Sequence, residues 1–296
     1  MESASKRWAD DGSRLILILS SERSGSTLLR VMLGEHSRII APAELFFMRY
    51  PDYRSWHRLK REAIDSVIEY FDLLGFPKTP AEIDDICRNF DWRQVYDWLF
   101  SFLPHGSFLL DKTPAYANQM TSLTRSAYFQ PFYIWLIRHP LGVIDSHVRL
   151  KRKELDGLRR LRRRINERVE SFLDGGMSKL ARERESKWVR QNSNIRRFLA
   201  TIPEQQKHIV RFENLVTNPS STLSDLCVAI GLDFEPAVAS PRIKRRVMKA
   251  GIGDPNFDTH SQVDQEPAVG WKRRLSERTL TPETLNLMRE IGVTGI

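Results

Sequence analysis

A short, uninterrupted apolar run near the N-terminus constrains the fold of this chain more than any other feature of its sequence. Residues 15–19 read Leu-Ile-Leu-Ile-Leu, and a run of this length without polar alternation is typical of a parallel strand buried on both faces. Small polar residues occupy positions 20–27, and helical spacing of apolar residues begins at Leu28. The sequence therefore predicts a strand, a tight loop and a helix, in that order.

Three further apolar runs, at 108–110, 133–137 and 208–212, have the same character, and helical periodicity follows each of them. Strands that alternate with helices form parallel sheets with helices on both faces. We therefore expect an α/β protein with a three-layer, P-loop-like fold, in which helices flank a central, mostly parallel sheet. The chain contains no internal repeat and no Pro- or Gly-rich linker. We expect a flexible N-terminus at 1–13 and a single domain over 14–296.

Two other segments carry structural signals. Thr79, Pro80 and Glu82 form the pattern of a capping box with proline at the first helical position. We expect this helix to run to about Phe102, before Pro104 and Gly106. Residues 239–278 show little periodicity, which favours long functional loops.

The charge of the chain is unevenly distributed. The formal net charge is +9, and residues 151–168 hold nine lysines or arginines against three acidic residues. A basic surplus favours anionic partners. This segment predicts either a solvated helical face or a docking surface for an acidic protein or anionic acceptor. Nucleic acid is disfavoured because no aromatic residues interleave the charges.

The cysteines and the apolar segments exclude other classes. Cys87 and Cys227 are the only cysteines; both lie in amphipathic helical patterns, so we expect buried free thiols rather than disulfides. They cannot form a metal-ligand cluster, and no metal is expected. No apolar segment has the length of a signal or a membrane span. The expected location is cytoplasmic, with no membrane span.

The loop after the first predicted strand has the chemistry of a phosphate-binding element. A loop between a buried strand and a helix directs backbone N–H groups and the positive end of the helix dipole at a bound anion. Its candidate ligand-binding residues are Arg23, Ser24, Gly25, Ser26, Thr27 and Leu28. It lacks the Gly-Lys pair of the P-loop of Mg-dependent NTPases. The alternative is a polar turn that only caps a helix.

A second candidate element follows the predicted strand at 133–137. Arg138 ends the strand, Pro140 suits the first turn of a helix, and Ser146 lies six residues further on, about 1.7 turns along that helix. Arg138 and Ser146 can therefore hold one phosphate from two sides, with a charged and a neutral donor. The alternative is a surface arginine at the end of a strand.

The order, spacing and residues of these two elements resemble the PAPS-dependent sulfotransferase superfamily (PAPS is 3′-phosphoadenosine-5′-phosphosulfate). Two later segments match as well: Arg211 to Leu215 with Asn218-Pro219, and Gly270-Trp271-Lys272. The resemblance covers roughly residues 14–280. It implies that the first loop holds the 5′-phosphosulfate of PAPS, and that Arg138, Ser146, Trp271 and Lys272 hold the 3′-phosphate. PAP would then be the desulfated product.

Within the superfamily, residues 23–33 and 250–257 resemble the sulfotransferase domains of olefin-forming polyketide synthases. Those domains sulfate a β-hydroxyl of an acyl chain tethered to a carrier protein. The resemblance implies a role in polyketide biosynthesis, with a carrier-bound acyl chain or a related natural product as acceptor. An acidic acyl carrier protein is the implied partner. The basic segment 151–168 departs from that pattern, so the acceptor stays open.

Sulfuryl transfer requires an acceptor in line, a base for its proton and positive charge near the leaving phosphate. Glu44, in a short loop after the first predicted helix, is the leading candidate base, as the resemblance to bacterial and heparan-type members implies. His260 is the rival, because imidazole titrates near neutrality. Lys112 follows the strand at 108–110 and resembles a family lysine that would stabilise charge on the transferring group.

Two other functions compete with this one. A P-loop-like nucleotide phosphotransferase predicts dependence on ATP and Mg²⁺, and the missing Gly-Lys pair argues against it. A non-catalytic nucleotide-binding module predicts that Glu44 and His260 can be replaced without loss of function.

Overall fold

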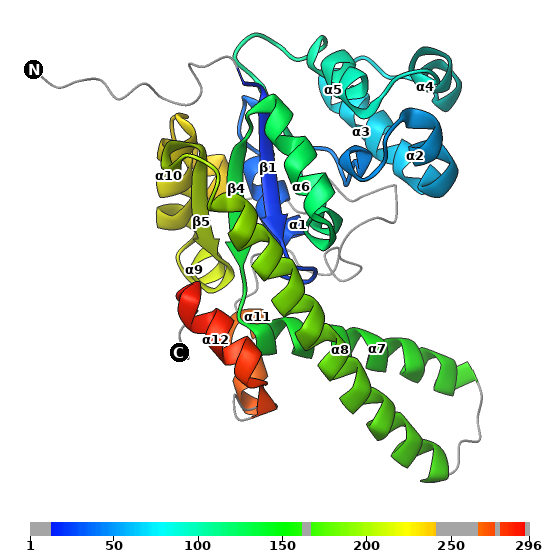
Figure 1. The fold of residues 1–296 in the computed structure, drawn as a ribbon, viewed down its shortest axis with the longest axis vertical. Helices are drawn as coiled ribbons and strands as arrows, with labels where there is room; N and C mark the ends of the chain where they lie inside the picture. Colours follow the sequence, from blue (N-terminus) through cyan, green and yellow to red (C-terminus); the bar gives the residue numbers. More distant parts are fainter. Residues whose placement is uncertain (1–12, 162–166, 241–265, 276–278, 294–296) are drawn as a thin grey trace, which may run out of the picture.

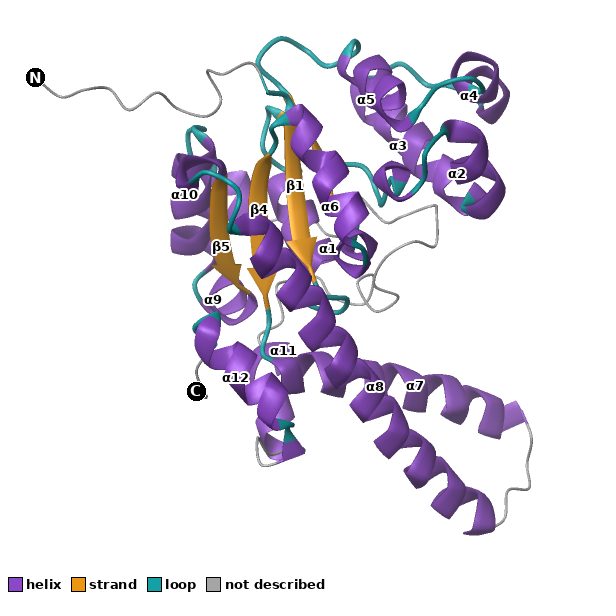
Figure 2. Cartoon of the chain, viewed as in Figure 1, coloured by secondary structure: helices purple, strands orange, loops and turns teal. Residues whose placement is uncertain are grey.

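A five-stranded parallel sheet forms the centre of the molecule. The computed structural model describes residues 13–161, 167–240, 266–275 and 279–293. The strands run in the order β2-β3-β1-β4-β5, and Figure 2 shows β1, β4 and β5 side by side. Their bounds are β1 Leu15–Ser20, β2 Ile39–Ile40, β3 Phe108–Asp111, β4 Phe132–Ile137 and β5 Lys207–Arg211. All four pairings between the strands of this sheet are parallel; Leu17, for example, is in register with Asp111 and with Tyr133. The predicted α/β fold is confirmed.

Helices cover both faces of this sheet. They are α1 Ser26–Leu33, α2 Tyr53–Leu59, α3 Ile64–Leu74, α4 Pro80–Cys87, α5 Trp92–Phe100, α6 Met120–Ser126, α7 Pro140–Leu161, α8 Glu167–Leu199, α9 Phe212–Thr217, α10 Pro219–Ile230, α11 Glu266–Val269 and α12 Pro282–Glu290. Residues of β1 alternate between two apolar clusters, as the period of two in a strand requires. Leu17 joins the cluster with α6 and α8, and Ile18 joins the one with α1, α9 and α10.

The prediction of one helix from Pro80 to about Phe102 is wrong, because the structure has two helices there. The capping box of Thr79 and Glu82 is present, but α4 ends at Cys87 and a new helix begins at Trp92. Asp91 starts that second helix, because its carboxylate accepts hydrogen bonds from the backbone of Arg93 and Gln94. The apolar spacing continues across the break, so periodicity alone does not reveal it.

Both cysteines are buried and unpaired, as expected. Burial raises the pKa of Cys87 to about 12 and the pKa of Cys227 to about 11. Neither thiol is therefore a reactive nucleophile near neutral pH.

Two long helices, α7 and α8, pack on each other and project away from the sheet (Figure 1). We expected the basic segment 151–168 to continue the helix that carries Ser146. Helix α7 carries this segment as far as Leu161; residues 162–166 lie outside the described residues, and α8 begins at Glu167. Among the described residues, none of the helices combines the length and the apolar character that a bilayer span requires. The expected flexible N-terminus lies outside the described residues, apart from Ser13.

Candidate active site

The loop between β1 and α1 has the backbone shape of an anion-binding turn. Arg23 has φ of 62° and Gly25 has φ of 88°, so two residues of the loop adopt the left-handed region. Gly25 is the N-cap of α1 and has no side chain to cap it, and the first turn of α1 holds no acidic residue. The N–H groups of this turn and the helix dipole are therefore suited to an external anion.

Gly25 is required here for a second reason. A Cβ atom at this position would lie 2.3 Å from Cδ2 of Phe212, which packs directly against the loop. The same ring lies 4.4 Å from the guanidinium carbon of Arg138, a distance at which a cation is attracted to an aromatic face. Phe212 therefore packs against both predicted phosphate-binding elements, at Gly25 and at Arg138.

The two predicted phosphate-binding elements meet in the structure. Arg23 Nε donates a hydrogen bond to Ser146 Oγ at 3.1 Å, and Arg138 Nη1 donates to the carbonyl oxygen of Arg23 at 2.8 Å. Arg138 lies at the end of β4 and is only 6% exposed. A loop after β1, the end of β4 and the second turn of α7 thus place two guanidinium groups and a hydroxyl together.

Further cations from α8 surround this point. Lys187 Nζ lies 2.5 Å from Glu22 Oε1, and Arg184 Nη1 lies 3.8 Å from Glu22 Oε2. Burial lowers the pKa of His147 to about 3, and the cations Arg184, Arg23, Lys187 and Arg138 lower it further. The imidazole next to Ser146 is therefore neutral near pH 7, in a strongly electropositive environment.

The predicted catalytic residues Glu44 and Lys112 form a buried ion pair. Lys112 Nζ lies 2.6 Å from Glu44 Oε1 and 3.4 Å from the Thr27 hydroxyl in the first turn of α1. Burial lowers the pKa of Lys112, and the carboxylate of Glu44 opposes that effect. The pair therefore lies beside the N-terminus of α1, the end of the helix that favours an anion.

Two charged residues that the sequence did not single out hold the loop before Glu44. Glu69 of α3 accepts a hydrogen bond from the Ala43 N–H at 2.8 Å, and Arg30 of α1 donates to the Ala41 carbonyl at 2.7 Å. Arg30 Nη1 and Glu69 Oε1 lie 3.6 Å apart, and Arg30 is 2% exposed. The loop is fixed on both sides, which sets the position of Glu44.

The C-terminal predicted residues lie close to Arg138. Trp271 is buried and stacks on His139, with ring centroids 4.2 Å apart and planes 12° apart. Arg138 Nη2 donates to the Pro267 carbonyl at 2.6 Å. Lys272 is exposed, with its Nζ 6.0 Å from the Trp271 ring. The structure thus brings Trp271 to the site as a packing residue and leaves Lys272 at the surface.

Two further contacts at the site involve residues that were not assigned a role from the sequence. Arg274 makes a bidentate pair with Asp145, at 2.8 and 2.9 Å, next to Ser146 on α7. Glu213, in the matched segment after β5, accepts a hydrogen bond from the His139 N–H at 3.0 Å. Both fix the backbone that positions Arg138 and Ser146. The rival base His260 lies outside the described residues.

Comparison with known proteins agrees with this architecture. The family described as "Sulfotransferase family" matches residues 16–236. The chain is 28% identical to the sulfotransferase domain of the Synechococcus PCC 7002 olefin synthase, with a TM-score of 0.78 over 95% of each chain. It is 31% identical to the sulfotransferase domain from the curacin biosynthetic pathway, with a TM-score of 0.76 over 95% of this chain and 98% of that one. No curated protein sequence matches the chain.

The family match covers most of the chain, including the loop after β1, the end of β4 and the segment after β5. It favours the predicted transferase over the competing phosphotransferase and over a non-catalytic module. By this match, and by the extent of its structural similarity, the chain belongs to the sulfotransferase family of enzymes.

Proposed function

We propose that this enzyme transfers the sulfuryl group of PAPS to a hydroxyl of an acceptor molecule. The observation that carries the proposal is the meeting of Arg23, Arg138 and Ser146 beside the uncapped N-terminus of α1. A nucleotide with phosphate groups at both its 3′ and 5′ positions requires such a pair of neighbouring anion sites. Arg23 and Gly25 have left-handed backbones, and contact with Phe212 excludes a side chain at Gly25. Both features are consistent with close approach of a phosphate to the backbone.

The donor's two ends are assigned to different elements in this proposal. The N-terminus of α1, with Ser24, Ser26 and Thr27, binds the 5′-phosphosulfate. Arg138 and Ser146 bind the 3′-phosphate, with Arg23 between the two ends, and Trp271 and Lys272 complete that side. Arg138 donates to two carbonyls, and because a guanidinium has five N–H donors, others remain for an oxygen of the 3′-phosphate.

Glu44 and Lys112 carry the chemical step. The acceptor oxygen attacks sulfur in line, its bond to sulfur forms, and the bond between sulfur and the bridging phosphate oxygen breaks. The proton of the acceptor passes to Glu44, and PAP leaves. Lys112, beside Thr27, stabilises the negative charge that develops on the bridging oxygen. His260 remains a second candidate base.

For the acceptor, we propose the β-hydroxyl of an acyl chain bound to an acidic carrier protein. The support is similarity to two sulfotransferase domains, one from an olefin synthase and one from the curacin pathway. The alternative acceptor is a small hydroxylated natural product of similar structure that is not bound to a carrier protein.

Thermal unfolding in the presence of PAP, ATP with Mg²⁺, or duplex DNA tests the donor assignment. Only PAP is expected to raise the melting temperature, because ligands that bind the folded state alone stabilise it. Mass spectrometry of a carrier-bound 3-hydroxyacyl chain, incubated with the enzyme and PAPS, tests the acceptor and should show the mass of one added sulfuryl group. Stabilisation by ATP with Mg²⁺ but not by PAP would refute the donor.

A further inference from the structure

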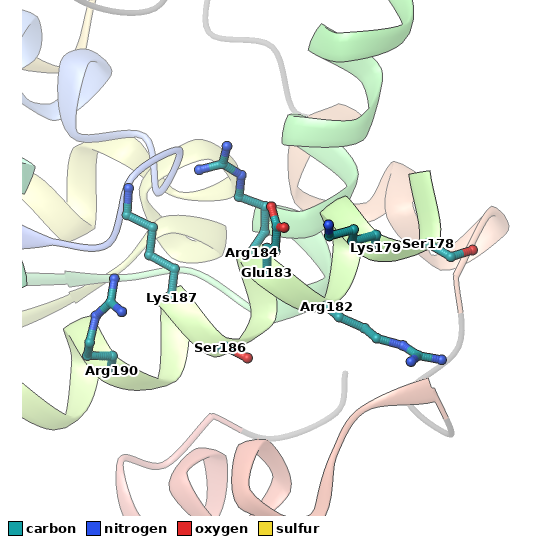
Figure 3. A pocket seen from close by; sticks show the side chains of 8 residues that line it. All are labelled: Ser178, Lys179, Arg182, Glu183, Arg184, Ser186, Lys187 and Arg190. Carbon is teal, nitrogen blue, oxygen red and sulfur yellow. The ribbon is translucent and has the colours of Figure 1, made fainter. Parts of the chain in front are cut away.

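A basic groove lies along α8, beside the loop that we assign to the donor. Its volume is about 790 Å³, and Figure 3 shows its lining side chains. Five of them are cationic and one is acidic: Lys179, Arg182, Arg184, Lys187, Arg190 and Glu183. The groove was not expected from the sequence, because none of its lining residues belongs to the most basic run of the chain, at 151–168.

Three of these cations are available to a partner. Lys179, Arg182 and Arg190 are exposed, and no ion pair within the described residues engages them. Spacings of three and eight residues place them on one side of a helix. Arg184 and Lys187 differ, since both pair with Glu22. The exposed cations therefore form a charged strip, and the two cations that pair with Glu22 lie between Arg182 and Arg190 on the same helix.

The contacts with Glu22 connect the strip to the proposed transfer site. Glu22 directly precedes Arg23, and its backbone N–H donates to Gln191 of α8 at 3.4 Å. Lys179 lies eight residues before Lys187, which is about 12 Å along the helix. A molecule bound to the strip would thus lie within about two helical turns of the residues that contact the donor loop.

We propose that this strip, Lys179, Arg182 and Arg190, docks the acidic protein that carries the acceptor hydroxyl. The inference rests on the proposed function, because it names where the acceptor's carrier binds. Charge complementarity supports it, since three unpaired cations beside the donor loop attract an acidic surface and orient it. A flexible prosthetic arm can then extend from the carrier to Glu44 and Lys112. Nucleic acid fits less well, because no aromatic side chain lines the groove for base stacking.

The double variant Lys179→Glu/Arg182→Glu tests the docking surface. Two substrates are compared: a 3-hydroxyacyl chain on a holo-acyl carrier protein, and the same chain on free pantetheine. We expect KM for the carrier substrate to rise about tenfold or more, with kcat unchanged. Kinetics with the pantetheine substrate and the affinity for PAP should stay at wild-type values. Added salt should raise the wild-type KM for the carrier and change that of the variant little.

The matched control is Arg58→Glu/Arg61→Glu, which reverses two exposed arginines on α2 and the turn after it. It should leave both substrates unaffected. Equal KM values for the carrier in wild type and in the α8 variant overturn the proposal. So does loss of binding to a short DNA duplex with unchanged carrier kinetics, which would assign the strip to nucleic acid. If the wild-type enzyme sulfates neither substrate, the acceptor assignment itself is wrong and the docking proposal is rejected with it.

Discussion

Lys112 Nζ and Glu44 Oε1 lie 2.6 Å apart, and the lysine is 2% exposed. This pair joins the end of β3 to the loop after β2, at the N-terminus of α1. Because the ammonium group is buried, Glu44 is its main compensating charge. The base and the leaving-group stabiliser of the proposed mechanism are therefore coupled, and a change to one alters the other.

Glu44→Gln should lower kcat by a factor of about 10² to 10⁴, the usual contribution of a positioned base. PAP affinity should be unchanged, because Glu44 does not contact the predicted phosphate-binding groups. Steady-state kinetics and calorimetric titration of PAP measure the two effects. Glu62→Gln, which changes an exposed glutamate on another element, is the control. Wild-type turnover by Glu44→Gln would leave His260 as the candidate base.

Glu69 should act as a positioning residue for Glu44. Glu69→Ala removes the acceptor for the Ala43 N–H. We expect kcat to fall about fivefold with KM for PAPS unchanged, because loss of a hydrogen bond of about 1 kcal/mol shifts the loop that positions Glu44. In Glu69→Gln the amide oxygen can still accept that bond, so most of the turnover should return. Equal losses in the two variants would indicate that the charge of Glu69 beside Arg30, rather than the hydrogen bond, matters.

The strands, and the position of the two candidate phosphate-binding segments at strand ends, were predictable because both depend on local sequence. Continuous apolar runs mark β1, β3, β4 and β5, since strands buried on both faces need no polar alternation. Helical spacing was enough to predict that Ser146 lies on the face of its helix that is close to Arg138. Strand β2 was missed because two residues, Ile39 and Ile40, carry no periodicity.

Contacts between distant segments account for what the sequence did not predict. Glu69 and Ala43 are 26 residues apart, and Arg274 and Asp145 are 129 residues apart. No spacing rule links such pairs, because each depends on how helices pack on the completed sheet. The segment from Arg211 to Leu215 was matched without a mechanism, and the structure supplies one: Phe212 supports Gly25 and Arg138.

Arg138→Ala should weaken PAP binding by a factor of about 10 to 100, the range for a hydrogen bond to a charged group. Arg138→Lys should recover little, because a single ammonium cannot reach the Arg23 carbonyl, the Pro267 carbonyl and a phosphate together. Calorimetric titration with PAP measures both, and Arg88→Ala at an exposed position is the control. Unchanged PAP affinity in Arg138→Ala would contradict the assignment of the 3′-phosphate site.

Gly25→Ala should reduce PAP affinity more than tenfold and destabilise the fold, because the added Cβ meets Phe212 at 2.3 Å in a left-handed backbone. Gly75→Ala is a matched control: its φ is 77°, but nothing lies within 4 Å of the added atom. It should show only the backbone cost of about 1–2 kcal/mol. Urea unfolding and PAP titration separate the two effects. An equal loss of stability in both variants would argue against the contact with Phe212.

His147 should make stability depend on pH. Its folded pKa of about 3 lies below the ordinary value of 6.5, so below pH 6.5 the unfolded chain binds a proton that the folded protein does not. The contribution of neutral His147 to the free energy of unfolding is therefore fully present above about pH 6.5 and is lost progressively as the pH falls toward 3. Urea unfolding at pH 7.5 and pH 5 should therefore show a smaller loss of stability for His147→Gln than for wild type. Every other titrating group, including His208, is common to both proteins, so the difference isolates His147. Equal losses would mean that burial and the surrounding cations do not keep this imidazole neutral at pH 5 in the folded protein.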